Sequence, residues 1–278
     1  MKRNGSRIIP TFVLCLVVGC GGAGEDEGEM VGEISGALKN KNALNPNALN
    51  PNVLDPSSFN SNALDPNALD PGLLSAEFLS AIQDPGTPGD YTRTLVKFIV
   101  GCALDSSQSF SFTWTDAQGV AQSPVHWGIL GLAPEWGRGP LSAAQQRWIS
   151  ACLASRANLY GASVTISSRG PHPLLESVDS AEHDEFPVFE GAFFGDLFAP
   201  TPVLHACFFP PSVGHAQSLM RACASGQSTG VGGITECGPI HVIGPCQSHC
   251  SGWSSEGYYT NCQVGGASYD EVVTTFLP

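Results

Sequence analysis

Charged side chains are scarce in this chain, and positive ones are the scarcest. Lysine, arginine, aspartate and glutamate together make up 13% of the 278 residues, with 12 basic against 25 acidic side chains and a formal net charge of −13. Nucleic acids require a basic surface that neutralises their phosphates, so this balance argues against a nucleic-acid partner. It also argues against electrostatic attraction to an anionic membrane surface.

Apolar runs long enough to cross a membrane are lacking as well. The run near the N-terminus extends only from Ile8 to Gly19, and Pro10 interrupts it. A transmembrane helix needs about 20 apolar residues, so we do not expect a permanent membrane-spanning helix there. Hydrophobic residues nevertheless make up 42% of the chain, which is enough for most of it to fold.

The first nineteen residues have the pattern of a cleavable signal peptide, because three basic residues precede the apolar run. Val17-Val18-Gly19-Cys20 resembles the lipobox of bacterial lipoproteins, in which a small residue precedes a cysteine. The resemblance implies cleavage before Cys20, lipidation of Cys20 and attachment to a membrane through acyl chains. Gly21, where a retention signal would have aspartate, favours the outer membrane or cell surface. The alternative is an ordinary signal peptide that contains a cysteine.

The segment after Cys20 is predicted to be a tether followed by a spacer. Residues 20–39 are acidic and Gly-rich, so we expect a solvated tether. Residues 40–74 form seven pentads of the type Asn/Asp-Pro-Asn-Ala-Leu. Each Asn/Asp-Pro step opens a type I turn, which predicts a flexible, turn-rich repeat spacer. The alternative is a small solenoid, because the period resembles that of pentapeptide-repeat proteins; in those proteins, however, alanine does not directly precede the leucine.

Cysteine usage fits an exported protein. Cys15 lies in the signal peptide and Cys20 is the predicted lipidation site, which leaves eight cysteines. These are Cys102, Cys152, Cys207, Cys223, Cys237, Cys246, Cys250 and Cys262. An even number in an exported chain predicts four disulfides, formed in an oxidising compartment. Eight cysteines allow 105 connectivities. Because Cys102 and Cys152 would each lie on an apolar helix face, we predict that these two pair.

Residues 75–278 are predicted to be one disulfide-linked α+β domain with a loop-rich C-terminal half, because six of the eight cysteines follow residue 206. Helices are expected from Asp70-Pro71 to Pro85, over 90–103, and from Ser142 to Tyr160. The third begins with a capping box formed by Ser142 and Gln145.

Strands are predicted where apolar and polar residues alternate. Phe110, Phe112 and Trp114 alternate with serine and threonine, and the turn at 116–119 should return the chain as a hairpin through residues 125–129. Further short strands are expected near residues 203–209, 240–243 and 272–277.

Three motifs suggest chemistry, and each has a plainer interpretation. Ser228 lies in a Gly-x-Ser-x-Gly sequence, but the nucleophile motif requires a strand before the serine and a helix after it. A glycine-rich loop is therefore expected. Residues 246–250 read Cys-Gln-Ser-His-Cys; the order is wrong for haem attachment, and disulfides are favoured over zinc thiolates. Residues 182–185, Glu-His-Asp-Glu, lack the spacing of a calcium loop and are expected to be a solvated acidic loop. No catalytic residue, metal site or cofactor is assigned.

Five further residues are leads for an unrecognised active site. Glu135 and Glu190 lie in aromatic, glycine-flanked surroundings that favour a raised carboxylate pKa. His126, His205 and His241 are the histidines that would complete such a site. His205 and His241 lie in apolar runs, so we expect them to be core or interface groups.

Aromatic residues are the basis of one more hypothesis, a glycan-binding surface, because exposed aromatic rings stack on sugars. Phe193, Phe194 and Phe198 are the residues expected to form such a patch. Trp127, Trp136 and Trp148 are a second aromatic set, for which core packing is the default.

From Leu95 onward the chain is similar to a family of uncharacterised exported bacterial proteins. The similarity is carried by three stretches: Trp148 to Leu153, Glu190 to Phe193, and Glu236 to Gly238. This resemblance implies no activity. The leading hypothesis is therefore a membrane-anchored cell-envelope lipoprotein with a non-catalytic binding or structural domain, whose partner is a protein or a glycan. The alternative is a secreted hydrolase.

Overall fold

The computed structural model describes residues 39–41, 69, 74–158, 164–176, 180–228, 234–235 and 239–278. The signal peptide, Cys20, most of the tether and pentads, and Cys237 lie outside these residues. The helices and 3-10 turns are α1 (Ala76–Gln83), α2 (Thr87–Ala103), η3 (Pro134–Gly137), α3 (Ala143–Arg156), α4 (Ser180–Glu185), η4 (Pro210–Ser212), α5 (Val213–Ser218), α6 (Ala222–Ser225) and η5 (Cys246–Ser248).

A six-stranded sheet is the largest element, with the order β1-β6-β15-β7-β8-β11. Its neighbours are antiparallel except β8 and β11, which run parallel. The strands of this sheet are β1 (Lys39–Lys41), β6 (Thr165–Arg169), β7 (Val188–Asp196), β8 (Val203–Phe208), β11 (Ile240–Pro245) and β15 (Val273–Leu277). The smaller ribbons are formed by β2 (Ser109–Ser111) with β5 (Val125–Trp127), β3 (Trp114–Thr115) with β4 (Ala121–Gln122), β9 (Gln227–Ser228) with β10 (Ile234–Thr235), and β12 (Cys250–Ser251), β13 (Asn261–Val264) and β14 (Ala267–Tyr269).

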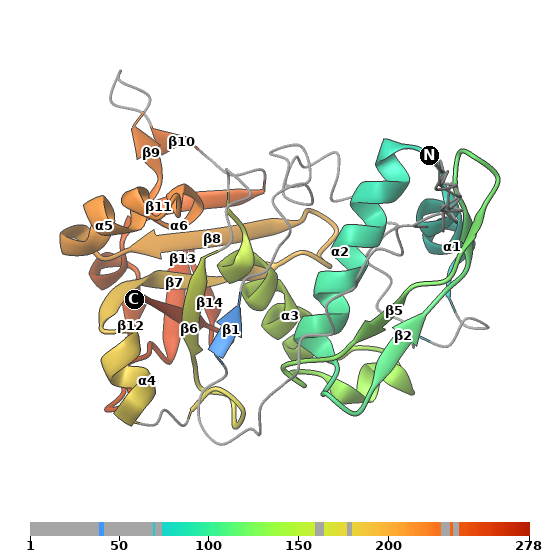
Figure 1. Cartoon of the computed structure of the whole chain (residues 1–278). Helices are drawn as coiled ribbons and strands as arrows, with labels where there is room; N and C mark the ends of the chain where they lie inside the picture. The colour runs from blue at the N-terminus through green and yellow to red at the C-terminus, as the bar shows by residue number, and fades with distance from the viewer. Residues whose placement is uncertain are drawn as a thin grey trace, which may run out of the picture. The chain divides into compact units, whose positions relative to one another are not determined.

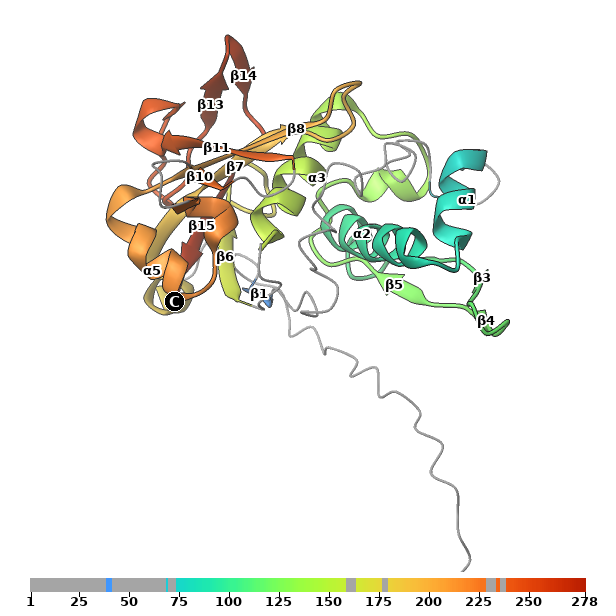
Figure 2. The same ribbon diagram turned by 90° about the horizontal axis from the view of Figure 1, so that it is seen from above.

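The two faces of the main sheet are covered by different layers. Phe193, Leu204 and Ile240 point into a core shared with α2 and α3, and α3 lies across the sheet on that side (Figures 1 and 2). Phe194 and Cys207, which alternate with them, point the other way and pack with the β12–β13–β14 ribbon. The α+β character expected from the sequence is confirmed.

Helix α3 begins as predicted. The Ser142 side chain accepts a hydrogen bond from Gln145 N, and Gln145 Oε1 accepts one from Ser142 N at 2.9 Å, which completes the capping box. The helix ends at Arg156, earlier than the predicted Tyr160, which lies outside the described residues. One face of the helix, including Ile149 and Cys152, is fully buried.

The first two helices begin at other residues than predicted. Helix α1 is capped by Ser75, whose side chain accepts from Phe78 N at 3.1 Å, so it starts at Ala76 and not at Asp70-Pro71. Helix α2 starts at Thr87, three residues earlier than expected. Pro88 lies in its first turn, where a missing N–H costs no helical hydrogen bond.

The last two pentad leucines belong to the core. Leu69 and Leu74 are 6% and 8% exposed, and Leu69 N donates to Trp136 O at 3.0 Å. Farther toward the N-terminus, Asn40 in β1 aligns with Ile166 in β6, so β1 forms one edge of the main sheet. Two points of the predicted tether and spacer region are therefore joined to the folded part.

Three disulfides link described cysteines: Cys102–Cys152, Cys207–Cys246 and Cys250–Cys262. The predicted pairing of Cys102 with Cys152 is confirmed, and it ties α2 to α3. Cys223 is also disulfide-bonded. Within the described ranges, no helix is both long and apolar enough to cross a membrane.

Candidate functional site

Glu190 lies in β7 at the centre of the sheet and is held by an arginine. Arg221 Nε donates to Glu190 Oε1 at 2.8 Å, and Arg221 Nη2 donates to Oε2 at 3.0 Å. Thr275 Oγ1, from β15, also donates to Oε2 at 2.8 Å. The two charged side chains are 0% and 1% exposed. Glu190 is therefore one half of a buried bidentate ion pair.

Arg221 uses its remaining donors on the end of α3. Its Nη2 donates to Ser155 O at 2.8 Å and its Nη1 to Ala157 O at 3.2 Å. Carbonyl groups in the last turn of a helix have no intrahelical partner and attract a cation. The pair thus ties together β7, β15, α3 and the start of α6. Glu190 therefore has a structural role in this hydrogen-bond network.

The acidic stretch at 182–185 is not the solvated loop that the sequence suggested. It lies in α4, and Glu182 is 1% exposed while the three residues after it are exposed. Glu182 accepts a short hydrogen bond from Ser167 Oγ, and its Oε1 lies 3.9 Å from Nε of the buried Arg169. Burial lowers the pKa of Arg169 from its ordinary value, and the charge of Glu182 opposes that shift.

His205 and His241 are brought together by the parallel pairing of β8 and β11. They are register partners, and their ring centroids lie 6.2 Å apart. His205 also lies beside Tyr269, at 5.9 Å, and is 8% exposed. Burial, together with the positive charges of His241 and His249, lowers the pKa of His205 to about 4. His205 is therefore a neutral ring packed under the β13–β14 ribbon, as expected for a core histidine.

The other two leads lie on separate elements. Glu135 is exposed in η3, where it accepts a hydrogen bond from Gln145 Nε2 at 2.9 Å. His126 lies in β5, with its ring 5.7 Å from that of Phe112. Of the five leads, the structure brings together only His205 and His241.

The remaining sequence motifs have structural roles. Ser228 lies in the two-residue strand β9, and the short helix α6 precedes that strand. Cys246 and Cys250 pair with Cys207 and Cys262, as the disulfide interpretation predicts. Among the described residues, no group of three or more His, Cys, Asp or Glu side chains is placed to hold a metal ion.

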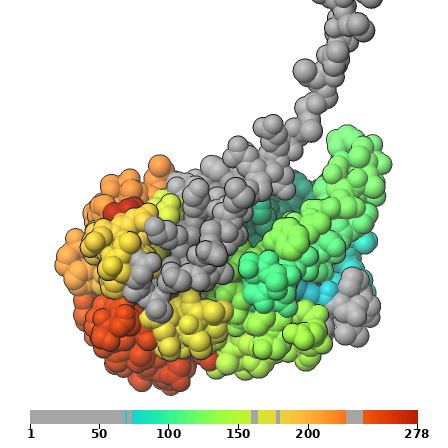
Figure 3. Space-filling model, turned by 60° about the horizontal axis from the view of Figure 1, so that its bottom comes forward, coloured from blue at the N-terminus to red at the C-terminus, as the bar shows by residue number. Residues whose placement is uncertain are grey.

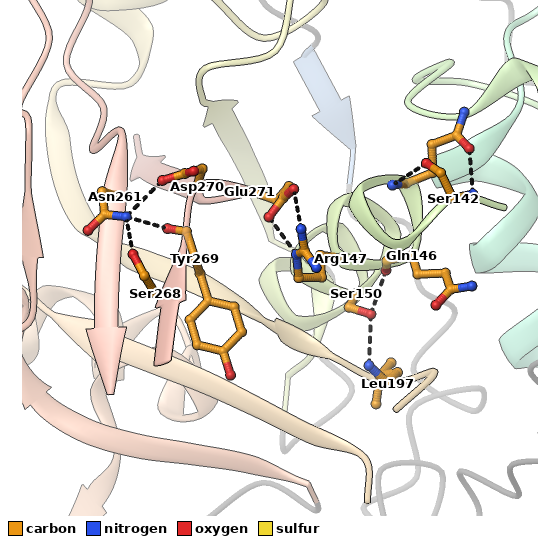
Figure 4. Close-up of polar contacts among 11 residues, drawn as sticks. Ser142, Gln146, Arg147, Ser150, Leu197, Asn261, Ser268, Tyr269, Asp270 and Glu271 are labelled. Carbon is orange, nitrogen blue, oxygen red and sulfur yellow. Dashed lines mark hydrogen bonds and ion pairs between the residues drawn. The ribbon is translucent and has the colours of Figure 1, made fainter. Parts of the chain in front are cut away.

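Polar contacts also fix the C-terminal ribbon and the helix layer (Figure 4). Arg147 in α3 donates through Nε and Nη2 to Glu271, at 2.7 and 2.9 Å, and this carboxylate raises the pKa of Arg147. Ser150 Oγ accepts from Leu197 N at 2.9 Å. Asn261 Nδ2 donates to Asp270 Oδ1 at 2.7 Å and thereby braces β13 against the segment before β15.

A cavity of about 450 Å³ lies beside α1 and the start of α2, and none of the candidate site residues from the sequence lines it. It is lined by Ala76, Glu77, Ser80, Ala81, Asp84, Pro88 and Thr92. The lining offers two carboxylates and two hydroxyl groups and has no aromatic ring or histidine. It contains no histidine or cysteine, so a Ser-His or Cys-His catalytic pair is absent from its lining.

The predicted aromatic patch does not exist as a surface. Phe193 and Phe194 are both 0% exposed, because they occupy opposite faces of the covered strand β7. Trp136 and Trp148 are likewise buried, which confirms core packing for them. Trp127 differs from these, with an exposure of 60%.

Trp127 belongs to a face of the hairpin at 109–127 that is exposed along its whole length. The eight outward residues, here named the hydroxyl–tryptophan face, are Ser109, Ser111, Thr113, Thr115, Ala121, Ser123, Val125 and Trp127. On one strand every outward side chain carries a hydroxyl group. On the other strand Val125 and Trp127 are 50% and 60% exposed.

Cross-strand register aligns the two rows. Trp127 lies opposite Ser109 and Val125 opposite Ser111, and the hydroxyl groups of Thr113 and Ser123 are 3.1 Å apart. The tip, β3–β4, projects from the rest of the folded part in Figure 2, and the green part of the chain forms a projecting arm in Figure 3. Serine–phenylalanine alternation in the sequence is the signal for this face, and it predicts a half-buried strand.

The inward side of the hairpin is firmly anchored. Phe110 is 4% exposed, and the Arg93 guanidinium of α2 lies 3.5 Å from the centre of the Trp114 ring. Gly128, directly after β5, packs so closely that a Cβ atom would lie 2.3 Å from the carbonyl carbon of Leu104. The exposed face is therefore presented by a fixed support.

Comparisons of the chain with protein-family models, with curated proteins and with solved structures gave no match.

Proposed function

We propose that the protein is a membrane-anchored cell-envelope lipoprotein whose folded part binds a partner and does not catalyse a reaction. The observation that supports export, the part of this proposal on which the rest depends, is the set of three disulfides between described cysteines. Such bonds form and persist in oxidising compartments outside the cytoplasm. Export is also what the basic-then-apolar N-terminus and the lipobox-like sequence at Cys20 predict.

The carboxylates support binding over catalysis. Glu190 and Glu182 are buried beside Arg221 and Arg169, where their charges are used to hold the core. A catalytic carboxylate must instead reach the substrate. The alternative, a secreted hydrolase, is favoured by one observation, the proximity of His205 and His241. In that reading one of the two rings would act as the base.

The proposed plan of the chain has four parts: a signal peptide (1–19), a tether (20–39), a pentad spacer (40–74) and a single folded domain (75–278) with a loop-rich C-terminal half. Within the tether and spacer, residues 39–41 join the main sheet of the folded domain, and Leu69 and Leu74 join its core. Acyl chains on Cys20 would attach the protein to the outer membrane or cell surface. No nucleic-acid partner is proposed, because the chain without its signal peptide carries nine basic residues against 25 acidic ones, a formal charge of −16.

The anchor is tested by replacing Cys20. We expect Cys20→Ser to move the protein from the membrane fraction to the soluble exported fraction and to abolish incorporation of labelled palmitate. Cys15→Ser is the matched control, because it removes a cysteine of the signal peptide and should leave both properties unchanged. Retention of Cys20→Ser in the membrane with undiminished labelling would refute the lipoprotein assignment.

The non-catalytic assignment is tested with a fluorophosphonate probe, which labels activated serines, and with a panel of ester, peptide and glycoside substrates. We expect neither labelling nor turnover, and His205→Phe serves as the comparison for any turnover that is seen. Turnover that His205→Phe abolishes, in a protein that stays folded, would establish the hydrolase alternative.

A further inference from the structure

The hydroxyl–tryptophan face has a composition unlike the rest of the chain. Between residues 109 and 127 the only acidic or basic residues are Asp116 and His126, and neither belongs to the eight outward positions. The Asp116 carboxylate is occupied, since it accepts hydrogen bonds from Val120 N at 2.8 Å and Gln122 Nε2 at 2.9 Å, and these bonds lower its pKa. The hydroxyl–tryptophan face of this acidic protein therefore carries no charged side chain.

We propose that this face binds a neutral glycan chain. The inference rests on the proposed binding function and assigns to it a site and a ligand class. Aromatic faces pack against the C–H groups of a sugar ring, and Trp127 offers the largest exposed aromatic surface on the hairpin. Serine and threonine hydroxyl groups both donate and accept hydrogen bonds, as sugar hydroxyl groups do.

The spacing of the two rows suits a linear ligand. Side chains on one face of a strand recur about every 7 Å, so Ser109, Ser111 and Thr113 form a ladder of hydroxyl groups parallel to Val125 and Trp127. A sugar chain lying along the hairpin would place ring faces over the apolar row and hydroxyl groups against the polar row.

Charge selects the class of glycan. An anionic polysaccharide would meet the net charge of the chain, −16 without its signal peptide, and this face has no cation to compensate that charge. A cationic partner would be attracted to acidic parts of the chain and would gain nothing here. The neutral face therefore fits an uncharged ligand. Its row of four hydroxyl side chains distinguishes it from a surface that inserts into lipid, because such a surface is apolar.

Rigid support makes the face suitable for recognition. The Cys102–Cys152 disulfide fixes α2, Leu130 N donates to Gly101 O of α2 at 2.9 Å, and Arg93 of α2 holds Trp114. A preorganised surface loses little entropy when it binds, which favours a ligand that makes many weak contacts.

The test uses the full chain carrying Cys20→Ser, so that lipid cannot contribute to retention. Binding is measured as depletion from solution by insoluble cellulose, chitin and starch, with polygalacturonate and phosphatidylcholine vesicles as charged and lipid comparisons. We expect retention by at least one neutral polysaccharide, with Trp127→Ala weakening it about tenfold or more. Ser111→Ala and Thr113→Val should each weaken it about threefold.

Trp253→Ala is the matched control. Trp253 is 49% exposed, lies away from the hairpin in the segment after β12, and should leave polysaccharide binding unchanged within about twofold. Thermal melting of each variant checks that the chain remains folded. Equal losses for the two tryptophans, retention by no neutral polysaccharide, or a Trp127-dependent preference for vesicles would each overturn the glycan assignment.

The glycan inference and the proposed function fail in different ways. A chain that Cys20→Ser releases from the membrane, but whose binding is indifferent to Trp127→Ala, retains the lipoprotein assignment and loses this site. A chain that binds the polysaccharide through Trp127 and also releases new reducing ends from it retains the site and loses the non-catalytic assignment.

Discussion

Arg221 and Glu190 form a bidentate ion pair at the buried centre of the main sheet, although 31 residues separate them in the sequence. Both hydrogen bonds are at most 3.0 Å long, and the arginine also satisfies two carbonyl groups at the end of α3. A buried charge with such partners is stable only while all of them are present. Removing one partner of the pair should therefore lower stability strongly.

We expect Arg221→Met to lower the free energy of unfolding by about 3 to 5 kcal/mol, because it leaves Glu190 charged and buried without its cation. Urea denaturation followed by circular dichroism measures this loss. Arg147→Met is the control: it breaks an equally short pair with Glu271, but Arg147 is 32% exposed, so we expect a loss of about 1 kcal/mol or less. Equal losses for the two variants would contradict the structural role of Arg221.

His205 should make stability depend on pH in the weakly acidic range. Its pKa is about 4 in the folded chain, and an unfolded histidine has a pKa of about 6.5. Below pH 6.5 the unfolded chain therefore takes up a proton that the folded chain refuses. The free energy of unfolding is therefore unaffected by His205 above pH 6.5 and declines as the pH falls toward 4. At pH 4 the contribution of His205 has lowered it by about 3 kcal/mol.

His205→Phe isolates that contribution. Phenylalanine keeps the contacts with Phe194 and Tyr269 but cannot be protonated, so the decline between pH 6.5 and 4 should be smaller by about 3 kcal/mol than in the native chain. Denaturation curves at several pH values provide the measurement. Parallel stability profiles of the two proteins would show that His205 is not the group responsible.

Disulfide loss should scale with loop length. The Cys102–Cys152 bond closes a loop with a sequence separation of 50, and the Cys250–Cys262 bond one of 12. Chain-entropy arguments give contributions of about 4 and about 3 kcal/mol. We therefore expect the Cys102→Ala/Cys152→Ala variant to be the less stable of the two double variants in urea. The reverse order would show that contacts other than chain entropy dominate.

Leu69 tests whether the last pentads are part of the core. We expect Leu69→Ala to reduce stability by about 2 to 4 kcal/mol, since it removes a buried leucine side chain that is 6% exposed. Leu174→Ala, at a site that is 45% exposed, should cost about 0.5 kcal/mol or less. A Leu69→Ala variant as stable as the native chain would mean that the pentads contribute nothing to folding.

Structural features that depend on neighbouring residues could be predicted from the sequence. Ser142 and Gln145 marked the start of α3, and alternation around Phe110 marked the hairpin. The Cys102–Cys152 bond also followed, because helical periodicity placed each cysteine on an apolar face. In these cases the periodicity of the apolar residues and the capping motif are enough to predict the local structure, without knowledge of contacts to distant parts of the chain.

The central strand β7 was missed for a physical reason. It is covered on both faces, so apolar residues such as Phe193 and Phe194 follow one another directly and no polar-apolar alternation reveals a strand. The run was instead interpreted as an exposed aromatic patch. Gly191, which looks like an interruption, is required because a Cβ atom there would lie 2.1 Å from the Cys207 carbonyl oxygen.

The candidate site was only half visible in the sequence. The alternating serine and threonine residues at 109–115 predicted a strand with one polar face. Exposure of Trp127 depends on which distant elements fail to cover that face, and no local pattern contains this information. The same limit applies to Arg221, because nothing near residue 221 indicates that its partner is in β7.

The two borders of the six-stranded sheet have a consequence for self-association. One border is β1, a strand of only three residues. The other is β11, where the register shifts between Val242 and Pro245, Gly244 has a φ of 111°, and Pro245 offers no amide hydrogen. One edge strand is short, and the other contains a bulge and a proline. Both edges therefore offer few backbone hydrogen-bonding groups with which a strand of a second molecule could pair. We therefore expect that the main sheets of two molecules do not pair edge to edge, and that the folded part remains monodisperse when it is concentrated.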